Sequence, residues 1–186
     1  MALVDRVKNI LLTPKTEWPV IAGEEATPQS IYVGYVLILA AIGPIAMAVR
    51  GGMFGITAGI FGYAVSLVVT FALAWIVDAL APTFGGEKNF VQSLKLVAYS
   101  YTAAWIAAVF NILGAIGGVI GLLGAIYAFY TFYLGVPVMK KCPAEKAIAY
   151  TIVVVICGIV LGVVLGGFLM TAILGGGMMG GTGLMR

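Results

Sequence analysis

The side chains that could carry chemistry in this 186-residue chain are few, and most stand at the edges of long apolar segments. Asp78 closes one apolar segment and Lys95 opens the next, with Glu87 in the polar stretch between them. An ionisable group at the boundary of an apolar segment is a candidate functional site by default. We therefore consider an ion pair between Asp78 and Lys95. The alternative is that both only mark helix ends, which suits the long lysine side chain better than the short aspartate.

Hydroxyl and aromatic side chains form a second candidate site, in two clusters. The first cluster is Tyr99, Ser100, Tyr101 and Thr102, and the second is Tyr127, Tyr130, Thr131 and Tyr133. Together they could line a polar groove, and the alternative is the aromatic belt that marks a membrane interface. We expect Tyr130 and Tyr133 to belong to a belt. The groove suits Ser100 and Thr102, whose hydroxyls would otherwise bond only to their own helix.

Lys140, Lys141 and Cys142 lie together in a short charged stretch, KKCPAEK. We expect Lys140 and Lys141 to belong to a surface that a partner can contact. A cationic neighbour could lower the pKa of the Cys142 thiol and make it reactive. Because neither a second cysteine nor a base stands beside it, we favour an unreactive loop thiol. Cys157 lies well inside the last apolar segment, so no disulfide is expected.

The methionines near the C-terminus, Met178, Met179 and Met185, are the last candidate ligands. Thioether sulfur suits a soft cation such as Cu(I). The glycines between them fix no coordination geometry. A flexible Gly/Met-rich tail over 175–186 is therefore the favoured interpretation.

Several classes of function are disfavoured by what the sequence lacks. It contains no histidine, the commonest catalytic base and zinc ligand. It has no nucleophile–base pair, no phosphate-binding loop and no metal-ligand spacing. It also has no basic tract interleaved with aromatic residues, as nucleic-acid binding would require. We expect no enzyme activity, no cofactor and no nucleic-acid partner.

The elements that must position these side chains are membrane-spanning helices. Hydrophobic residues make up 62% of the chain and charged residues 9%, whereas soluble domains carry about 25% charge. Residues 96–139 contain no charge at all, and one span needs about 20 apolar residues. That stretch is long enough for two helices, with a turn over 111–118, where Asn111 and several glycines lie. The composition predicts an all-α, polytopic membrane helical bundle.

Five spans are expected, in a domain that covers 31–174. They run approximately over 31–49, 60–80, 94–113, 116–136 and 147–174. The glycine-rich segment 51–59 is predicted to be the turn between the first two spans. Pro44 is predicted to kink the first span, because proline has no N–H to continue the helix.

Residues 1–30 precede the first span and are expected to form a cytoplasmic, interfacial segment. Apolar residues at helical spacing predict an amphipathic helix over 1–13, with Asp5, Arg6 and Lys8 largely on the opposite face. Trp18 follows, and its indole suits the headgroup layer.

The distribution of basic residues predicts the orientation. With five spans and a cytoplasmic N-terminus, every lysine and arginine except Arg50 and Arg186 falls on the cytoplasmic side. The reverse orientation places nearly all of them outside, against the positive-inside rule. We therefore expect the N-terminus inside and the C-terminus outside.

Glycines at near-helical spacing are expected to hold the spans together. They are Gly158, Gly162 and Gly166 in the fifth span, and Gly114, Gly117, Gly118, Gly121 and Gly124 near the start of the fourth. Helices in lipid associate through such small residues. We predict that the fourth and fifth spans pack face to face through them. The alternative is that one set of glycines forms the contact of a homo-oligomer.

Three segments of the chain resemble the Ypt-interacting-protein (Yip) family, in particular a prokaryotic member. They are DRVKNILLTPKTEWPVIAGE from Asp5, AYSYTAAWIAAVFNILGAIG from Ala98 and IYAFYTFYLGVPVMKKCPAEKAIAYTIVVVI from Ile126. The likeness covers nearly the whole chain, from Asp5 to about Val164. It implies a five-span protein with a cytoplasmic N-terminus, in agreement with the arrangement above. The eukaryotic branch that it resembles is implicated in membrane traffic and in binding small prenylated GTPases.

The resemblance and the charge placement together predict a multi-pass protein of a prokaryotic cytoplasmic (inner) membrane. It would organise the membrane or bind a partner through its cytoplasmic face. Besides the lipid bilayer, the expected partners are a cytoplasmic protein and a second copy of the chain. The rival function is a small-solute or ion transporter or channel, with Asp78, Lys95 and residues 99–102 at its inner mouth.

Overall fold

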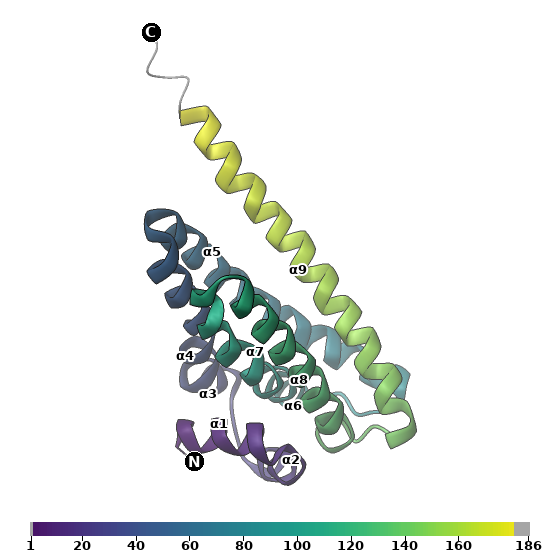
Figure 1. Ribbon diagram of the computed structural model, residues 1–186. Helices are drawn as coiled ribbons and strands as arrows, with labels where there is room; N and C mark the ends of the chain where they lie inside the picture. The colour runs from purple at the N-terminus through teal and green to yellow at the C-terminus, as the bar shows by residue number, and fades with distance from the viewer. Residues whose placement is uncertain (1, 181–186) are drawn as a thin grey trace.

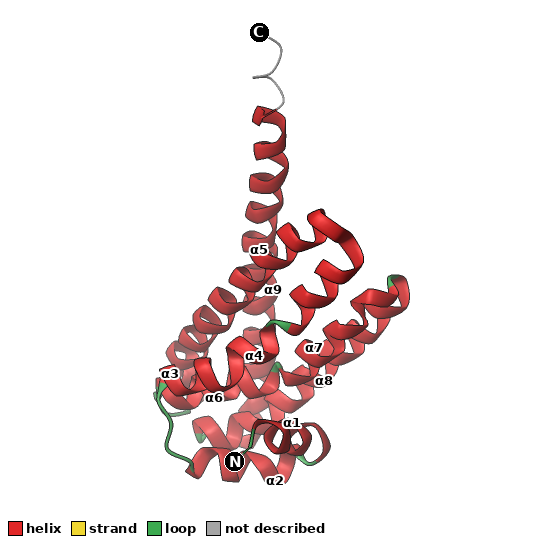
Figure 2. Cartoon of the chain, turned by 90° about the vertical axis from the view of Figure 1, so that its left-hand side faces the viewer, coloured by secondary structure: helices red, strands yellow, loops and turns green. Residues whose placement is uncertain are grey.

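The computed structural model describes residues 2–180, with the side chains of residues 2–168 and of Thr171. Helices joined by short turns make up this part of the chain (Figure 1), and none of it forms a strand (Figure 2). The elements are α1 (Leu3–Leu12), α2 (Pro14–Gly23), α3 (Pro28–Ile31), the π-helical turn η1 (Tyr32–Val36), α4 (Leu37–Ala40), α5 (Ile42–Leu80), the 3₁₀ turn η2 (Ala81–Phe84), α6 (Phe90–Ser100), α7 (Thr102–Ala107), the 3₁₀ turn η3 (Ala108–Leu113), α8 (Ala115–Lys140) and α9 (Ala144–Gly180).

Four stretches of the described chain are long and apolar enough to cross a membrane. They are Pro28–Phe84, Phe90–Leu113, Ala115–Lys140 and Ala144–Phe168. The first of them has 57 residues, whereas a single span needs about 20. The prediction of an all-α chain with long apolar helices is confirmed, and the first stretch holds two of the helices expected from the sequence.

The first apolar stretch folds into a helical hairpin at Gly52. Within α5 only Gly52 has non-helical backbone angles, φ 53° and ψ −138°, in a region that glycine tolerates best. The Tyr63 hydroxyl donates to the Leu37 carbonyl at 2.9 Å. The Tyr32 hydroxyl donates to the Leu67 carbonyl, also at 2.9 Å. Because these two pairs straddle Gly52, the arms on either side of it run antiparallel.

The turn predicted over 51–59 is shorter in the structure, because only Gly52 leaves the helical region. Gly55 and Gly59 let the two arms approach each other. A Cβ atom at Gly59 would lie 2.9 Å from the Pro44 carbonyl oxygen, and one at Gly55 would collide with the facing arm. One residue with positive φ is enough to reverse the chain, and Gly55 and Gly59 serve packing.

The first arm is irregular on the N-terminal side of Pro44. One turn of π-helix covers Tyr32–Val36, and the helix is interrupted at Ala41, between α4 and α5. A proline lacks an N–H and clashes with the carbonyl four residues earlier, so a break falls just before it. The interruption at Ala41 agrees with the predicted kink.

The second hairpin turns at Gly114, inside the turn predicted over 111–118. Gly114 has a φ of 67° and separates η3 from α8. Along this hairpin α8 packs closely on α7, because a Cβ atom at Gly124 would lie 2.9 Å from the Ala103 carbonyl oxygen. Figure 2 shows the turns of both hairpins toward the end of the molecule opposite the N-terminal helices.

The predicted face-to-face packing of glycines between α8 and α9 is wrong. On α8, Gly117 and Gly124 approach the preceding elements η3 and α7 of their own hairpin. On α9, nothing lies within 4 Å of where a Cβ atom would stand at Gly162 or Gly166. A short turn brings α8 to its hairpin partner first, and glycine spacing alone does not say which neighbour a helix will meet. The homo-oligomer contact stays a prediction.

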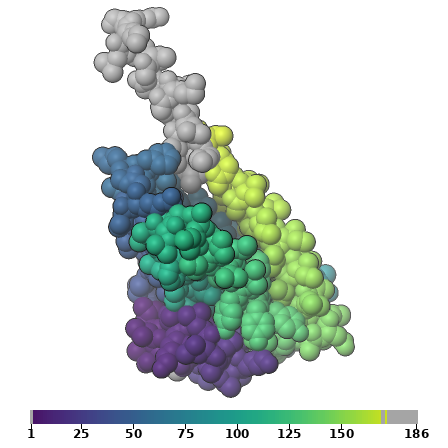
Figure 3. Space-filling model, viewed as in Figure 1, coloured from purple at the N-terminus to yellow at the C-terminus, as the bar shows by residue number. Residues whose placement is uncertain are grey.

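The N-terminal segment forms two helices that pack on the bundle. The amphipathic helix predicted over 1–13 is α1, and α2 follows it directly from Pro14. The prediction that Trp18 lies in the headgroup layer is wrong: its side chain is fully buried and its indole N–H donates to the Thr131 carbonyl at 3.0 Å. In Figure 3 the N-terminal residues (purple) cover the lower end of the molecule. We call this end the base; it also contains the loops 85–89 and 141–143 (Figure 1).

The last helix, α9, leaves the base and extends past the other helices (Figure 1). It continues through Gly180, beyond the end predicted at Leu174. Met178 and Met179 lie outside the described side chains, and Met185 lies outside the described residues. The methionine cluster therefore stays a prediction.

Candidate functional site

A buried lysine ties three helices together at the base. The Lys140 ammonium group donates three hydrogen bonds: to Asp78 Oδ1 at 2.9 Å, to Ser93 Oγ at 2.7 Å and to the Asn89 carbonyl at 3.2 Å. Its side chain is 0% exposed and that of Asp78 is 13% exposed. The prediction that Lys140 belongs to a surface open to a partner is therefore wrong, whereas Lys141 is exposed. Because an ammonium group has three donors, every donor of Lys140 is satisfied.

The Asp78 carboxylate in this cluster also has several hydrogen-bond donors. Asp78 Oδ1 also accepts the backbone N–H of Asn89 at 2.7 Å and faces the Ser93 hydroxyl at 3.1 Å. Asn89 caps α6, so the carboxylate fixes the start of that helix as well as the end of α8. We call Asp78, Asn89, Ser93 and Lys140 the base clamp. It joins the C-terminal ends of α5 and α8 to the N-terminal end of α6.

The two loops beside the base clamp hold each other through backbone groups. The Glu87 N–H donates to the Lys140 carbonyl at 2.8 Å, and the Cys142 thiol donates to the Phe84 carbonyl at 3.1 Å. Burial raises the pKa of the Cys142 thiol. The alternative of a thiol activated by Lys141 is therefore wrong, because desolvation outweighs the nearby positive charge, which comes chiefly from Lys146.

The predicted pair of Asp78 and Lys95 does not form, and Lys95 does not extend to water. Its side chain is buried, and its ammonium group donates to the Ile21 carbonyl at 2.9 Å and to the Glu24 carbonyl. These carbonyls lie at the end of α2, where a helix leaves backbone acceptors without partners. A cation is favourable at that end of a helix dipole. Lys95 therefore fastens α2 to α6.

Arg6 completes a second ionic cluster that the sequence pattern did not reveal. Its guanidinium forms ion pairs with Glu17 and Glu24, and its Cζ lies 5.6 Å from the centre of the Tyr99 ring. The pattern assigned Arg6 to the polar face of α1. The sequence feature that could have revealed the cluster is the pair of acidic residues Glu17 and Glu24. In the structure α2 folds back and brings them over the polar face of α1. We call Arg6, Glu17, Glu24 and Lys95 the N-terminal clamp.

The hydroxyl residues of the predicted groove divide between two sides of the helix. The Thr102 hydroxyl lies 2.6 Å from the Tyr35 hydroxyl and donates to the Tyr99 carbonyl at 2.6 Å. The Tyr35 and Tyr99 rings meet edge to face, with centroids 4.5 Å apart. Tyr99 and Thr102 therefore pack against Tyr35 of the first arm. Their partners are inside the protein, so they do not line a groove.

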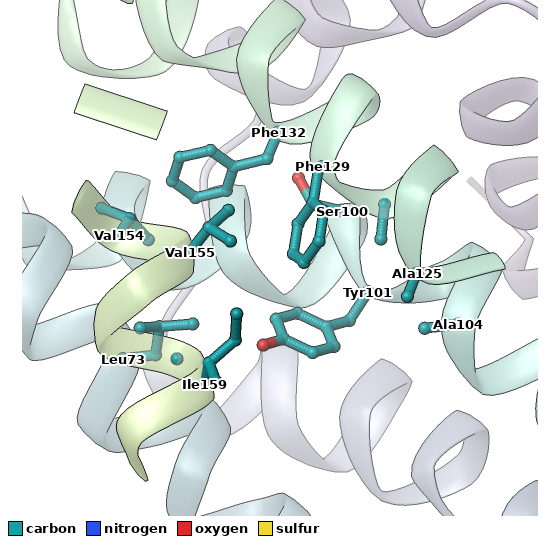
Figure 4. A pocket seen from close by; sticks show the side chains of 12 residues that line it. Leu73, Ser100, Tyr101, Ala104, Ala125, Phe129, Phe132, Val154, Val155 and Ile159 are labelled. Atoms are coloured by element: carbon teal, nitrogen blue, oxygen red, sulfur yellow. The ribbon is translucent and has the colours of Figure 1, made fainter. Parts of the chain in front are cut away.

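Ser100 and Tyr101 face the other way, into a cavity of about 220 Å³. Figure 4 shows it between Tyr101, the phenylalanines of α8 and the valines of α9. The remaining lining residues are Leu73, Ala104, Ala125, Ala128, Phe129, Phe132, Val154, Val155, Gly158 and Ile159. The sequence therefore identified the polar residues Ser100 and Tyr101, but it did not predict that they lie in an apolar cavity.

The second hydroxyl cluster lies on α8, and its members have different roles. The Tyr127 hydroxyl donates to the Leu11 carbonyl at 2.6 Å and so holds the end of α1. Thr131 is buried and its hydroxyl returns to the Tyr127 carbonyl. Tyr130 and Tyr133 are exposed, as an interfacial belt would need, and their membership of such a belt stays a prediction.

Comparison with known families shows what kind of protein carries these clamps. The model of the Yip1 domain matches residues 8–166, a range that includes both clamps except for Arg6. Comparison with curated proteins and with solved structures returns no significant match. Members of the Yip1 family are generally non-enzymatic proteins of membrane traffic. With the match extending over most of its length, the chain belongs to the Yip1 domain family of multi-pass membrane proteins.

Proposed function

We propose that this protein is a membrane-embedded platform that binds a cytoplasmic protein through its base, in a prokaryotic inner membrane. The observation that carries the proposal is the contrast between the inside and the outside of the base. The buried charges of the base clamp satisfy one another. The charged side chains around it point outward: Glu87, Lys88, Lys141, Glu145 and Lys146.

The exposed charges are weakly held and therefore available to a partner. Lys141 and Glu87 form an ion pair at 2.8 Å, but their side chains are 70% and 64% exposed. Such surface pairs contribute only about 0–1 kcal/mol to stability, so exchanging one partner for a group of another protein costs little. The loops that carry them are fixed from beneath by the base clamp. A surface of this kind presents charge on a rigid support, which favours recognition.

The same geometry gives less support to a transporter. A solute at the inner mouth would need ionisable groups that can bind it. Asp78 and Lys140 bind each other, and Lys95 is occupied by the end of α2. A solute would have to displace these contacts before it could interact with any of the three.

Site-directed photo-cross-linking tests the platform. A photoreactive phenylalanine analogue is placed at Lys88 or at Lys146 on the base, and at Val49 as a control. Val49 is also strongly exposed, at 71%, but lies beside the Gly52 turn, at the far end of the molecule. We expect one recurrent cytoplasmic protein to be cross-linked from both base positions and not from Val49. The double charge reversal Lys141→Glu with Lys146→Glu should abolish the cross-linked product formed from Lys88. It should leave the melting temperature within a few degrees of that of the parent protein.

Reconstituted liposomes provide the opposing measurement. The platform predicts no protein-dependent flux of small solutes or ions. Flux that persists in Lys141→Glu, disappears in Asp78→Ala and stays absent in Asp78→Asn combined with Lys140→Met, a double variant expected to keep most of the stability, would establish the transporter instead.

A further inference from the structure

The cavity lined by Ser100 and Tyr101 has no part in the proposed platform, because it lies within the helices and away from the base. Helices rise about 1.5 Å per residue, so Tyr101 lies roughly 16 Å along its helix from the start of α6. The hydrocarbon core of a bilayer is about 30 Å thick. In a chain that spans the membrane, the cavity therefore lies near the middle of the bilayer.

Two hydroxyl groups at this cavity are without hydrogen-bond partners in the described part of the chain. Ser100 is 2% exposed and its Oγ is buried and unpaired. The Tyr101 hydroxyl has no hydrogen bond among the described residues, and it lies 3.6 Å from where a Cβ atom would stand at Gly158. Figure 4 shows it pointing toward Ile159 and Leu73. Other buried hydroxyls in helices, such as those of Thr131 and Thr151, bond to a carbonyl one turn earlier.

An unpaired hydroxyl is unfavourable in this place. Neither water nor headgroups are available in the hydrocarbon core, so a polar group there must find its partner inside the protein or on a ligand. The cavity supplies only apolar walls besides these two hydroxyls. What fits is a molecule with a hydrogen-bond acceptor and an apolar body.

The walls narrow the choice of ligand further. No lining residue is ionisable except Tyr101, so a phosphate or carboxylate headgroup would be unpaired, and the ligand should be neutral. Phe129, Phe132 and Tyr101 place three aromatic rings around the space (Figure 4), which favours a planar ring. An apolar cavity of about 150 Å³ is large enough for benzene, and this one is about 220 Å³.

The cavity is reached from the side of the bundle. Phe129 and Ile159 border it and are 36% and 57% exposed. These surfaces belong to the spans α8 and α9, which lipid surrounds in the membrane. A ligand would therefore enter from the lipid phase between α8 and α9, with its tail remaining among the acyl chains.

We propose that this cavity binds the ring of a neutral quinone-type lipid, one ring carbonyl of which accepts a hydrogen bond from the Tyr101 hydroxyl. Binding of such a lipid requires no contact with the base. It is therefore independent of the proposed platform, and either can fail alone.

Binding of radiolabelled decyl-benzoquinone to the protein in lipid nanodiscs tests the proposal. Unlabelled decyl-benzoquinone should compete, whereas decylbenzene, which has the ring and tail without carbonyls, should compete at least tenfold more weakly. Dioleoylglycerol carries ester carbonyls but no ring, and it should compete as poorly. Tyr101→Phe should weaken binding on the order of tenfold, because one hydrogen bond is lost. Tyr130→Phe, at an exposed tyrosine of the same bundle, should leave it unchanged.

Filling the cavity provides the matched control. Gly158→Leu places a side chain beside Tyr101 and should abolish binding, whereas Gly162→Leu, one turn further along α9, meets no atom within 4 Å of its Cβ and should have no effect. Both variants should elute as the parent protein does. Equal competition by decylbenzene, preference for dioleoylglycerol, or undiminished binding in Gly158→Leu would each overturn the proposal.

Discussion

At the scale of single residues, the base clamp makes the strongest prediction. Asp78→Asn leaves the Lys140 ammonium buried without its counter-charge. Removing one partner of a buried ion pair costs about 3–5 kcal/mol; because Ser93 and the Asn89 carbonyl still accept from Lys140, we expect about 3 kcal/mol. Equilibrium unfolding by denaturant in detergent micelles measures the loss.

A double variant separates the lost pair from a general disturbance. Asp78→Asn combined with Lys140→Met removes both charges and should recover most of the stability, because apolar replacements of buried pairs are often tolerated. The exposed Lys141→Met serves as the matched control and should change the free energy of unfolding by less than about 1 kcal/mol. If Asp78→Asn proved as harmless as Lys141→Met, the clamp would not be a buried pair in solution.

The Cys142 thiol gives a prediction about pH. Burial disfavours the thiolate, so its pKa is raised in the folded protein. In a Cys157→Ser background, alkylation by iodoacetamide should reach half of its maximal rate at a pH above the ordinary thiol value of about 8.5. The raised pKa also makes the free energy of unfolding depend on pH. The stabilisation from burying the neutral Cys142 thiol is fully present below the thiol pKa of the unfolded chain, and it is lost as the pH rises through the higher pKa of the folded protein. Denatured protein should titrate at the ordinary value, and a folded thiol reacting at or below it would contradict the burial.

The sequence showed which charged residues matter more readily than it showed which partners they bind. Asp78, Lys95 and Lys140 are prominent because charge is rare in this chain, and all three are buried or nearly so. Their partners depend on how the helix ends meet at the base, which no local pattern encodes. Arg6 shows the same limit, since its acidic partners belong to a helix that folds back over α1.

At the scale of elements, the docking of α2 depends on a glycine of α8, which leaves room for a side chain of α2. The Trp18 ring lies against Gly135 of α8, where a Cβ atom would stand 2.6 Å from Trp18 Cε2. Gly135→Val should therefore displace α2, with a cost of about 1–3 kcal/mol typical of overpacking. Hydrogen exchange should become faster in residues 3–23 while the exchange of α8 and α9 changes little.

The control for this variant lies on the same helix. Gly118→Val meets no atom within 4 Å of its Cβ and should leave exchange in residues 3–23 unchanged. Equal protection of those residues in Gly135→Val and in the parent protein would show that the docking of α2 does not depend on the space that Gly135 leaves for the Trp18 ring.

The elements themselves were predictable to different degrees. The long apolar helices and the turn near Gly114 follow from hydropathy and glycine placement. The helix α2 was missed because Pro14 and Pro19 make its ten residues look like a loop, although a proline at the first helical position is favourable. Its stability comes from Trp18 and the N-terminal clamp, which are tertiary contacts.

At the scale of the whole molecule, the antiparallel hairpins at Gly52 and Gly114 make a specific prediction of topology. If each arm crosses the bilayer once, α9 provides a fifth crossing and leaves both hairpin turns on the side opposite the base. The base then carries every basic residue of the sequence except Arg50 and Arg186, and the positive-inside rule places it in the cytoplasm.

Reporter insertions distinguish this arrangement from the alternatives. A phosphatase that is active only outside the cytoplasm should be active after Gly52, after Gly114 and after Arg186, and silent after Lys141. A fluorescent protein that folds only in the cytoplasm should give the complementary pattern. A three-crossing chain, in which the Gly52 hairpin enters the membrane without reaching the far side, would silence the phosphatase at Gly52 alone. Activity after Lys141 with silence after Arg186 would reverse the orientation and move the base, with its exposed charges, away from any cytoplasmic partner.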